Sequence, residues 1–186
     1  MPLLGKIMLT TSREPTAKIR TLCNDLARVI PSIVRVNRGK MSTGEVAEKA
    51  LEIEAQKVIM IDRLHGGPGA IKFFKVEESG LVSIPPVIHV RSIMLNRELG
   101  SSGVKPAVSL IIQPTMTSKE IPKLAGALSK FFDIPILLMG KPSESVSTIM
   151  TVSCDETDHI VITFRSESES EIGPRIVVSS VEWQIE

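Results

Sequence analysis

Three short loops carry the residues of this sequence that are best suited to bind an anion. Each loop follows an apolar segment and combines Arg or Lys with Ser or Gly, at residues 10–13, 37–40 and 63–67. Guanidinium groups bind phosphate through paired hydrogen bonds, and backbone N–H groups near Ser and Gly can donate to a further oxygen. The candidate contact residues are Ser12, Arg13, Arg20, Arg38, Lys40, Arg63, His65, Gly66 and Gly67.

Strands predicted before the three loops would bring those loops together. The apolar or β-branched segments at residues 7–10, 32–36 and 57–62 each read as a strand. In an open parallel sheet the loops that leave the strand ends gather along one edge. We therefore expect the cationic side chains to converge there and to attract a polyanion.

Two helices are predicted between these strands. Apolar residues recur at three- and four-residue spacing over residues 15–30, which indicates one buried stripe that ends before Pro31. Ser42 and Glu45 form a capping-box pattern that begins a second helix over residues 42–53. The N-termini of both helices would lie on the same edge as the loops and add to its attraction for anions.

The remainder of the chain also alternates strands with turns and a helix. A break is predicted at Pro85-Pro86, a hinge at residues 99–103, and a second capping box at Thr117 and Glu120 that starts a helix ending at Phe132. Strand-like segments follow at residues 70–76, 87–94, 108–112, 134–139, 147–153, 159–165 and 175–183. The last three predict an antiparallel meander, and the class is α/β. The strand-helix-strand order after the hinge suggests a duplicated unit, although any α/β chain shows some repetition.

Charge is segregated between the two halves of the chain. Residues 1–99 hold 15 Lys or Arg and 10 Asp or Glu, a net charge of +5, whereas residues 100–186 hold 7 and 11, a net charge of −4. Within residues 13–40 there are seven basic residues and two acidic ones. This asymmetry favours an anion-binding first half.

Composition excludes several other classes of protein. With 186 residues and 42% hydrophobic content the chain can bury a sizeable core, and no apolar run approaches the roughly 18 residues that cross a bilayer. Residues 1–10 contain Lys6 and read as a strand rather than a signal peptide, so we expect a cytoplasmic protein. Cys23 and Cys154 lie far apart without metal-ligand spacing, and we expect no metal and no cofactor.

Four stretches occur in order along the chain, at residues 9–16, 36–40, 65–69 and 171–175, the last containing Gly173-Pro174-Arg175. Together they resemble the Brix-domain family of ribosome-biogenesis proteins. The chain is most similar to the small-subunit processome branch of that family, and its short length is similar to the archaeal single-domain form. The resemblance implies one Brix domain over residues 1–186, with similar halves at 1–99 and 104–186. Each half would be a mixed sheet with packed helices, like the anticodon-binding domain of class II aminoacyl-tRNA synthetases.

The same resemblance implies a function in pre-ribosomal RNA processing and subunit assembly, without catalysis. With no Tyr, one Trp and five Phe, the chain lacks the aromatic platforms on which single-strand readers stack bases, so backbone recognition is favoured. If about four phosphates are neutralised, the logarithm of the affinity should fall with the logarithm of salt concentration at a slope near −3.

Each candidate residue also has a structural interpretation. Ser12 is equally suited to cap the helix that follows, and the glycines to form a turn. Arg38 could form an ion pair with Asp62 or Glu14. For Arg175 we favour a structural function, in which it braces the turn before the last strand. The three His residues, which include His65, are typical of hydrogen-bonded loop or packed strand positions.

Two alternative functions remain open from the sequence. An enzyme is suggested by His65-Gly66-Gly67, which is similar to the oxyanion-hole loop of α/β hydrolases, but no Gly-x-Ser-x-Gly elbow, P-loop or His-Glu-x-x-His motif occurs. A protein-protein scaffold is the stronger alternative. The acidic second half, notably Glu167, Glu169 and Glu171, would suit a basic ribosomal or assembly-factor protein, unless this run is only a solvated turn.

Overall fold

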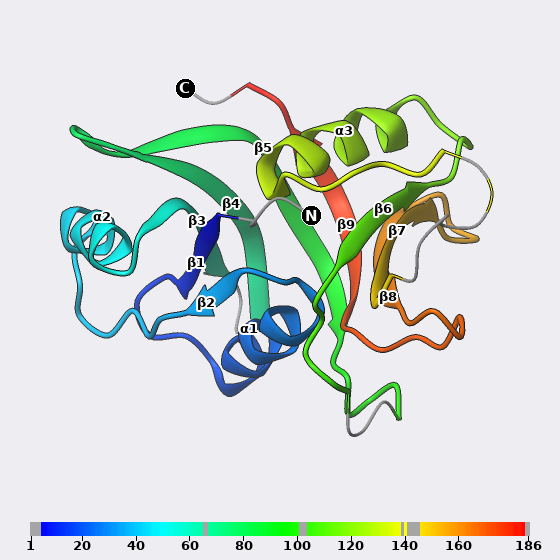
Figure 1. The fold of residues 1–186 in the computed structure, drawn as a ribbon, viewed down its shortest axis with the longest axis horizontal. Helices are drawn as coiled ribbons and strands as arrows, with labels where there is room; N and C mark the ends of the chain where they lie inside the picture. The colour runs from blue at the N-terminus through cyan, green and yellow to red at the C-terminus, as the bar shows by residue number, and fades with distance from the viewer. Residues whose placement is uncertain (1–4, 65–66, 101–103, 139, 141–145, 185–186) are drawn as a thin grey trace.

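One mixed β-sheet runs through the whole molecule (Figure 1). The computed structural model describes residues 5–64, 67–100, 104–138, 140 and 146–184. Within them the sheet has nine strands in the order β2-β1-β3-β4-β5-β9-β8-β7-β6, and three helices pack on it. No helix in these ranges is long and apolar enough to span a membrane.

The first half contains the parallel part of the sheet that was predicted from the sequence. Strands β1 and β3 and helices α1 and α2 match the predicted segments, and β1 pairs in parallel with both β2 and β3. Strands β4 and β5 then continue the sheet in antiparallel order. The bounds are β1 Lys6–Thr11, α1 Ala17–Val29, β2 Ile33–Arg35, α2 Thr43–Glu52, β3 Ala55–Leu64, β4 Gly67–Glu77 and β5 Gly80–Met94.

The second half is built from one parallel strand pair and an antiparallel meander. Strand β6 pairs in parallel with β7, and β7, β8 and β9 form the predicted meander. Strand β9 then pairs with β5, which joins the halves into one sheet. The bounds are β6 Leu110–Pro114, α3 Glu120–Phe132, β7 Thr148–Cys154, β8 Ile160–Arg165 and β9 Arg175–Glu182.

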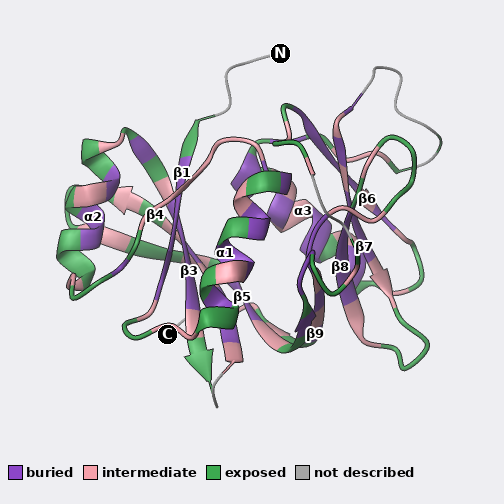
Figure 2. Ribbon diagram, turned by 90° about the horizontal axis from the view of Figure 1, so that it is seen from below, coloured by how far each residue is buried: buried purple, intermediate pink, exposed green. Residues whose placement is uncertain are grey.

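The helices cover both faces of this sheet. The buried stripes of α1 and α3 share one apolar core with residues from both halves, whereas α2 packs on the opposite face over a smaller cluster around Met8 and Val58. Figure 2 shows the buried sides of α1 and α3 turned toward the strands. Strands β1 and β3 are consequently covered on both faces, as their continuous apolar sequences require.

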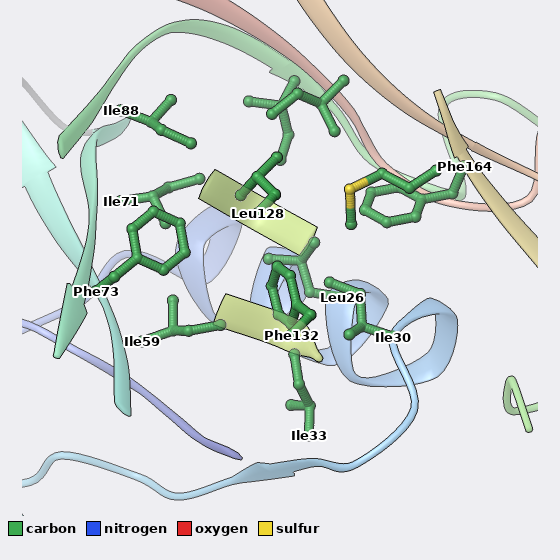
Figure 3. Close-up of a pocket in the computed structure, with 13 residues that line it drawn as sticks. Leu26, Ile30, Ile33, Ile59, Ile71, Phe73, Ile88, Leu128, Phe132 and Phe164 are labelled. Carbon is green, nitrogen blue, oxygen red and sulfur yellow. The ribbon is translucent and has the colours of Figure 1, made fainter. Parts of the chain in front are cut away.

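An apolar cavity of about 40 Å³ lies in the core between the halves (Figure 3). Its lining combines Leu26 of α1 and Leu128 of α3 with strand residues such as Ile71 and Phe164. All 13 lining residues are apolar. Because a water molecule there would find no polar side chain to bond, the cavity marks a packing junction rather than a polar ligand site.

Two predicted features of the strands are wrong. Pro85-Pro86 does not break the sheet, because β5 continues through both prolines where its register with β4 shifts between Ile71 and Phe73. Such a bulge tolerates residues without an N–H. The predicted strand at residues 134–139 is reduced to one parallel bridge between Ile112 and Ile136. Pro135 lacks an N–H for further pairing, and Met139 lies outside the described residues.

The predicted capping box at Thr117 and Glu120 is also wrong. Helix α3 begins at Glu120 with Lys119 at the N-cap position, and no side chain caps it. The Thr117 hydroxyl instead pairs with the Thr115 hydroxyl at 3.3 Å. Of the predicted hinge at 99–103, Leu99 and Gly100 belong to a turn after β5, and residues 101–103 lie outside the described part.

Strand order in the two halves is similar. The first half reads β2-β1-β3-β4-β5, with β1 parallel to its two neighbours. In the second half the bridge at Ile136, then β6, β7, β8 and β9, follow the same sequence of parallel and antiparallel pairs. Helices α1 and α3 occupy corresponding places in this order, after β1 and β6.

Candidate nucleic-acid interface

The three predicted loops lie at one edge of the parallel strands. Thr11, the last residue of β1, pairs with Ile61 of β3, and Arg35, the last residue of β2, pairs with Leu9. The chain therefore leaves all three strands at the same side of the sheet. Residues 12–16, residues 36–42 and the end of β3 meet there, and we call this the basic edge.

The loop at residues 12–16 is fixed by its neighbours on both sides. The Ser12 hydroxyl accepts a hydrogen bond from the Arg63 backbone N–H at 3.1 Å, and Nη1 of Arg63 donates to the Glu14 carbonyl at 3.3 Å. Nη1 of Arg20, on α1, donates to the Pro15 carbonyl at 2.7 Å. Two exposed guanidinium groups thus flank the loop and keep further N–H donors available.

Arg38 is placed differently from the other basic residues of the edge. Its side chain is only 7% exposed, and its Nε donates to the Met41 carbonyl at 2.7 Å. Nη1 contacts the sulfur of Met60 at 3.4 Å. Arg38 therefore shapes the second loop from within, whereas the neighbouring Lys40 is exposed.

Like charges approach one another at this edge. Burial lowers the pKa of the Arg38 guanidinium, and the charge of Arg13 lowers it further, while Asp62 acts in the opposite direction. The Asp62 carboxylate is itself paired with Lys72 at 2.6 Å. Arg13 is exposed beside this buried cation. An incoming anion would relieve the repulsion between the two arginines.

The two helix N-termini at the edge are not equivalent. On α2 the Ser42 hydroxyl accepts from Glu45 N–H, and the Glu45 carboxylate accepts from Ser42 N–H at 2.7 Å. These hydrogen bonds, with a contribution from Arg13, hold the pKa of Glu45 below its usual value. On α1 the N-cap is Thr16, and the first turn has no acidic residue. The α1 N-terminus is the one that remains available to an external anion.

The glycine-rich part of the third loop is described only in part. His65 and Gly66 lie outside the described residues, and Gly67 pairs with Leu64 at the start of β4. At Gly69 an added Cβ would lie 2.3 Å from the Cβ of Leu64. Gly69, which was not a candidate contact residue, is therefore required for close packing of the β3–β4 hairpin.

The turn before β9 also depends on close packing. Arg175 forms a bidentate ion pair with Glu171, with distances of 3.0 Å from Nε and 2.6 Å from Nη2. An added Cβ on Gly173 would lie 2.5 Å from the Cβ of Phe164, and Pro174 is buried beside it. These contacts brace the turn and do not reach the basic edge.

The structure brings together Ser12, Arg13, Arg20, Arg38, Lys40 and Arg63. Two of them have structural functions that the sequence did not establish. Ser12 ties β1 to β3 and does not cap α1, because Thr16 does. Arg38 bonds to a carbonyl and a sulfur rather than to the side chain of Asp62 or Glu14.

Arg35, which was not among the predicted site residues, holds the second loop in place. Arg35 bonds to the side chain of Asn37 at 3.0 Å and also to that of Asn24 on α1. It thereby fixes the start of the loop relative to the helix. The spacing of Arg35 and Asn37, two residues apart on one face of a strand end, was the available signal.

A thiol nucleophile for the enzyme alternative is not present at this edge. Cys23 is buried on α1, and burial raises the pKa of its thiol to about 11, with Arg35 acting in the opposite direction. Such a thiol is protonated at neutral pH and therefore a poor nucleophile.

The fold and the basic edge define a mixed α/β protein with a cationic sheet edge, and known proteins are similar to it in sequence and in fold. No protein-family model matches the chain. A probable Brix domain-containing ribosomal biogenesis protein of Methanococcus maripaludis is 27% identical over 177 residues, which cover 94% of this chain and 96% of that protein. A protein of the same description from Pyrococcus horikoshii is 30% identical over 102 residues, 54% of this chain. That match spans 44% of the Pyrococcus protein, so the chain aligns with about half the length of this relative.

More distant relatives and solved structures are also similar over most of this chain. The U3 small nucleolar ribonucleoprotein protein imp4 of Schizosaccharomyces pombe is 23% identical over 94% of this chain and 56% of its own length. The crystal structure of a probable ribosomal biogenesis protein from Aeropyrum pernix superimposes with a TM-score of 0.80 at 25% identity, covering 98% of both chains. The structure of Mil, an archaeal Imp4-like protein, gives a TM-score of 0.67 at 18% identity, covering 95% of this chain and 99% of Mil. The resemblance predicted from the sequence is confirmed: the chain is a homologue of the Brix domain-containing ribosomal biogenesis proteins.

Proposed function

We propose that this protein is a ribosome biogenesis factor that binds precursor ribosomal RNA through the phosphate backbone and assists processing and subunit assembly without catalysing a reaction. The observation that carries the proposal is the exposed Arg13 beside the buried Arg38, at an edge where Arg20, Lys40 and Arg63 also lie. The names of the relatives supply the ribosomal context.

Exposure of these cations favours an extended polyanion over a small anion. Arg13, Arg20, Lys40 and Arg63 are all exposed on loops or at the ends of elements. Neither the core cavity nor the groove beside α3 includes any of them in its lining. Small-molecule sites are concave and bury most of the ligand, whereas an open row of cations suits a chain of phosphates.

The same edge favours contact with the backbone of RNA over contact with its bases. Phe73, Phe131 and Phe132 pack against one another in the core, and Trp183 lies under Lys123 beside α3. None of them can serve as a stacking platform for a base at the basic edge. Arginine forks and the free N-terminus of α1 bind phosphate in any sequence context.

Salt dependence of binding is the experiment that tests the proposal. The four exposed cations Arg13, Arg20, Lys40 and Arg63 would each neutralise one phosphate. Arg38 is not counted because it is buried. Titration of a single-stranded ribosomal RNA fragment at several salt concentrations should then give a log-log slope of about −3. Binding whose affinity does not change with salt would contradict the proposal.

We also infer that residues 1–186 form a single domain made of two related halves, 1–99 and 104–186, similar to anticodon-binding domains. The matching strand orders support this inference. No observation favours the alternative in which the acidic run at 167–171 receives a basic partner. Glu171 in that run is engaged by Arg175, and residues 166–170 close a tight turn through the Ser166 N–H bond to the Ser170 carbonyl at 2.9 Å. The expected cytoplasmic location stays a prediction.

A further inference from the structure

A second cationic site lies beside α3. A groove of about 430 Å³ separates one face of this helix from the bulged part of β5 and from Trp183, which follows β9. Figure 1 shows the end of β9 passing next to α3. Apolar groups and lysines form its lining: Ile84, Pro85, Pro122, Gly126, Ala127, Phe131 and Trp183, with Lys57, Lys123 and Lys130.

Residue spacing on α3 explains the shape of the groove. Lys123, Gly126, Ala127 and Lys130 occupy helical positions i, i+3, i+4 and i+7, which share one face. The two small residues lie between the two lysines and leave the space open. A Cβ added at Gly126 would meet no atom within 4 Å. A glycine inside a helix lowers its stability relative to alanine, and packing within the protein does not require one here.

Charge in the groove is of one sign. Among the described residues its lining contains three lysines and neither Asp nor Glu. Lys57 is held by the Asp133 carboxylate at 2.6 Å and by the Phe131 carbonyl at 2.7 Å. Lys123 lies over the ring of Trp183 at 3.9 Å, and both Lys123 and Lys130 are exposed. Two exposed lysine side chains therefore border an apolar floor in the half of the chain that is otherwise acidic.

Trp183 adds a group whose hydrogen-bonding capacity is unused. Its indole N–H is buried and has no hydrogen-bond partner among the described residues. Buried polar groups in native proteins nearly always have a partner. This N–H has no accessible surface in the free protein, so a carbonyl or carboxylate of a bound molecule would reach it only after the Trp183 side chain shifts.

From this arrangement we propose that the groove binds an acidic segment of a partner protein, with one apolar side chain against Ala127 and Phe131 and flanking carboxylates on Lys123 and Lys130. The apolar floor favours a peptide over nucleic acid, because a sugar-phosphate chain has no group that gains from burial there. The charge pattern favours an acidic peptide over a neutral one. The site is separate from the basic edge and does not depend on its function.

Fluorescence anisotropy tests this proposal with a labelled model peptide of sequence Asp-Glu-Asp-Leu-Phe-Asp-Glu-Asp. The wild-type protein should bind it saturably, and the emission of Trp183, the one tryptophan of the chain, should change over the same concentration range. Lys123→Glu with Lys130→Glu should weaken binding at least about tenfold, because two attractive charges become repulsive. Gly126→Leu should block the groove and weaken binding to a similar extent without lowering the melting temperature.

Matched controls separate the groove from general electrostatics. Lys105→Glu with Arg165→Glu makes the same change in net charge at exposed positions outside the groove and away from α3 in the sequence, and it should leave the affinity within about twofold. Replacing Leu and Phe of the peptide by Ser, or its acidic residues by Asn and Gln, should abolish binding.

Three results would overturn the proposal. The first is absence of peptide binding by the wild-type protein. The second is equal weakening by the groove variant and the control variant. The third is a loss of affinity of the groove variant for an oligouridine RNA without a loss of affinity for the peptide. This outcome would assign the lysines to nucleic-acid binding. The variant Arg13→Glu, at the basic edge, should bind the peptide as the wild-type protein does.

Discussion

Reversing the charges of Arg13 and Lys40 together should weaken binding of a ribosomal RNA fragment by at least about thirtyfold at moderate salt. Both side chains are exposed at the basic edge, and each would lose an attraction to phosphate and gain a repulsion. The slope of affinity against salt should also become shallower, because fewer counterions are released. A filter-binding or anisotropy titration at two salt concentrations measures both effects.

Choice of residues decides whether this result can be interpreted. Arg38 is unsuitable, because its 7% exposed side chain is bonded within the protein and a Glu there would disturb folding. The pair Lys105→Glu and Lys119→Glu has the same net charge and lies away from the edge, so it should retain most of the affinity. Equal losses in the two pairs, at unchanged melting temperature, would mean that the basic edge has no special function in binding.

Gly173→Ala should lower the free energy of unfolding by about 2–3 kcal/mol, which is large for the addition of one methyl group. The new Cβ would lie 2.5 Å from the Cβ of Phe164 and 2.8 Å from two carbons of its ring. Phe164 is 1% exposed and packs in the shared core. Neither the ring of Phe164 nor the backbone of β8 can move without opening this core. The contact must therefore be relieved by displacing the turn that contains Gly173. Urea denaturation monitored by circular dichroism gives the change.

Gly126→Ala is the matched control for this substitution. It also adds one methyl group, but into open space on α3, and it should raise the free energy of unfolding by about 0.5–1 kcal/mol through helix propensity. If the two alanine variants had the same stability, the close contact between Gly173 and Phe164 would not exist in solution.

Local patterns predicted the helices of the first half well. The apolar stripe of α1 is buried as its spacing required, from Ile19 to Val29. The capping box at Ser42 and Glu45 has both of its hydrogen bonds. These features depend only on residues within one or two turns, so the sequence contains all the information needed to predict them.

Features that depend on distant residues were less predictable. The segment after Asp133 has strand-like composition but lies at the edge of the sheet, where Pro135 limits it to a single bridge. The prolines of β5 are accommodated by a bulge against β4, which only the pairing of two strands reveals. Helix α3 starts at Glu120, two residues later than a cap at Thr117 predicts, and the Thr117 hydroxyl pairs with that of Thr115 instead.

In the candidate site, too, the general arrangement was predictable and the long-range contacts were not. Convergence of the loops followed from the expected parallel order of three strands, which the structure confirms. The individual functions of the basic residues did not follow from it. Ser12 bonds to Arg63, 51 residues away, and the burial of Arg38 depends on Met60 of β3. Both contacts link segments whose relative position is set only by the completed sheet.

Crosslinking gives the most direct test of the central claim that the basic edge clasps an RNA backbone. Protein bound to a ribosomal RNA fragment containing photoreactive uridines can be irradiated, digested and analysed by mass spectrometry for peptides that carry nucleotides. The crosslinks should map to residues 12–20, 36–42 and 62–64, and reversing Arg13 and Lys40 should remove them. Crosslinks confined to the acidic second half, or to the groove beside α3, would contradict the account.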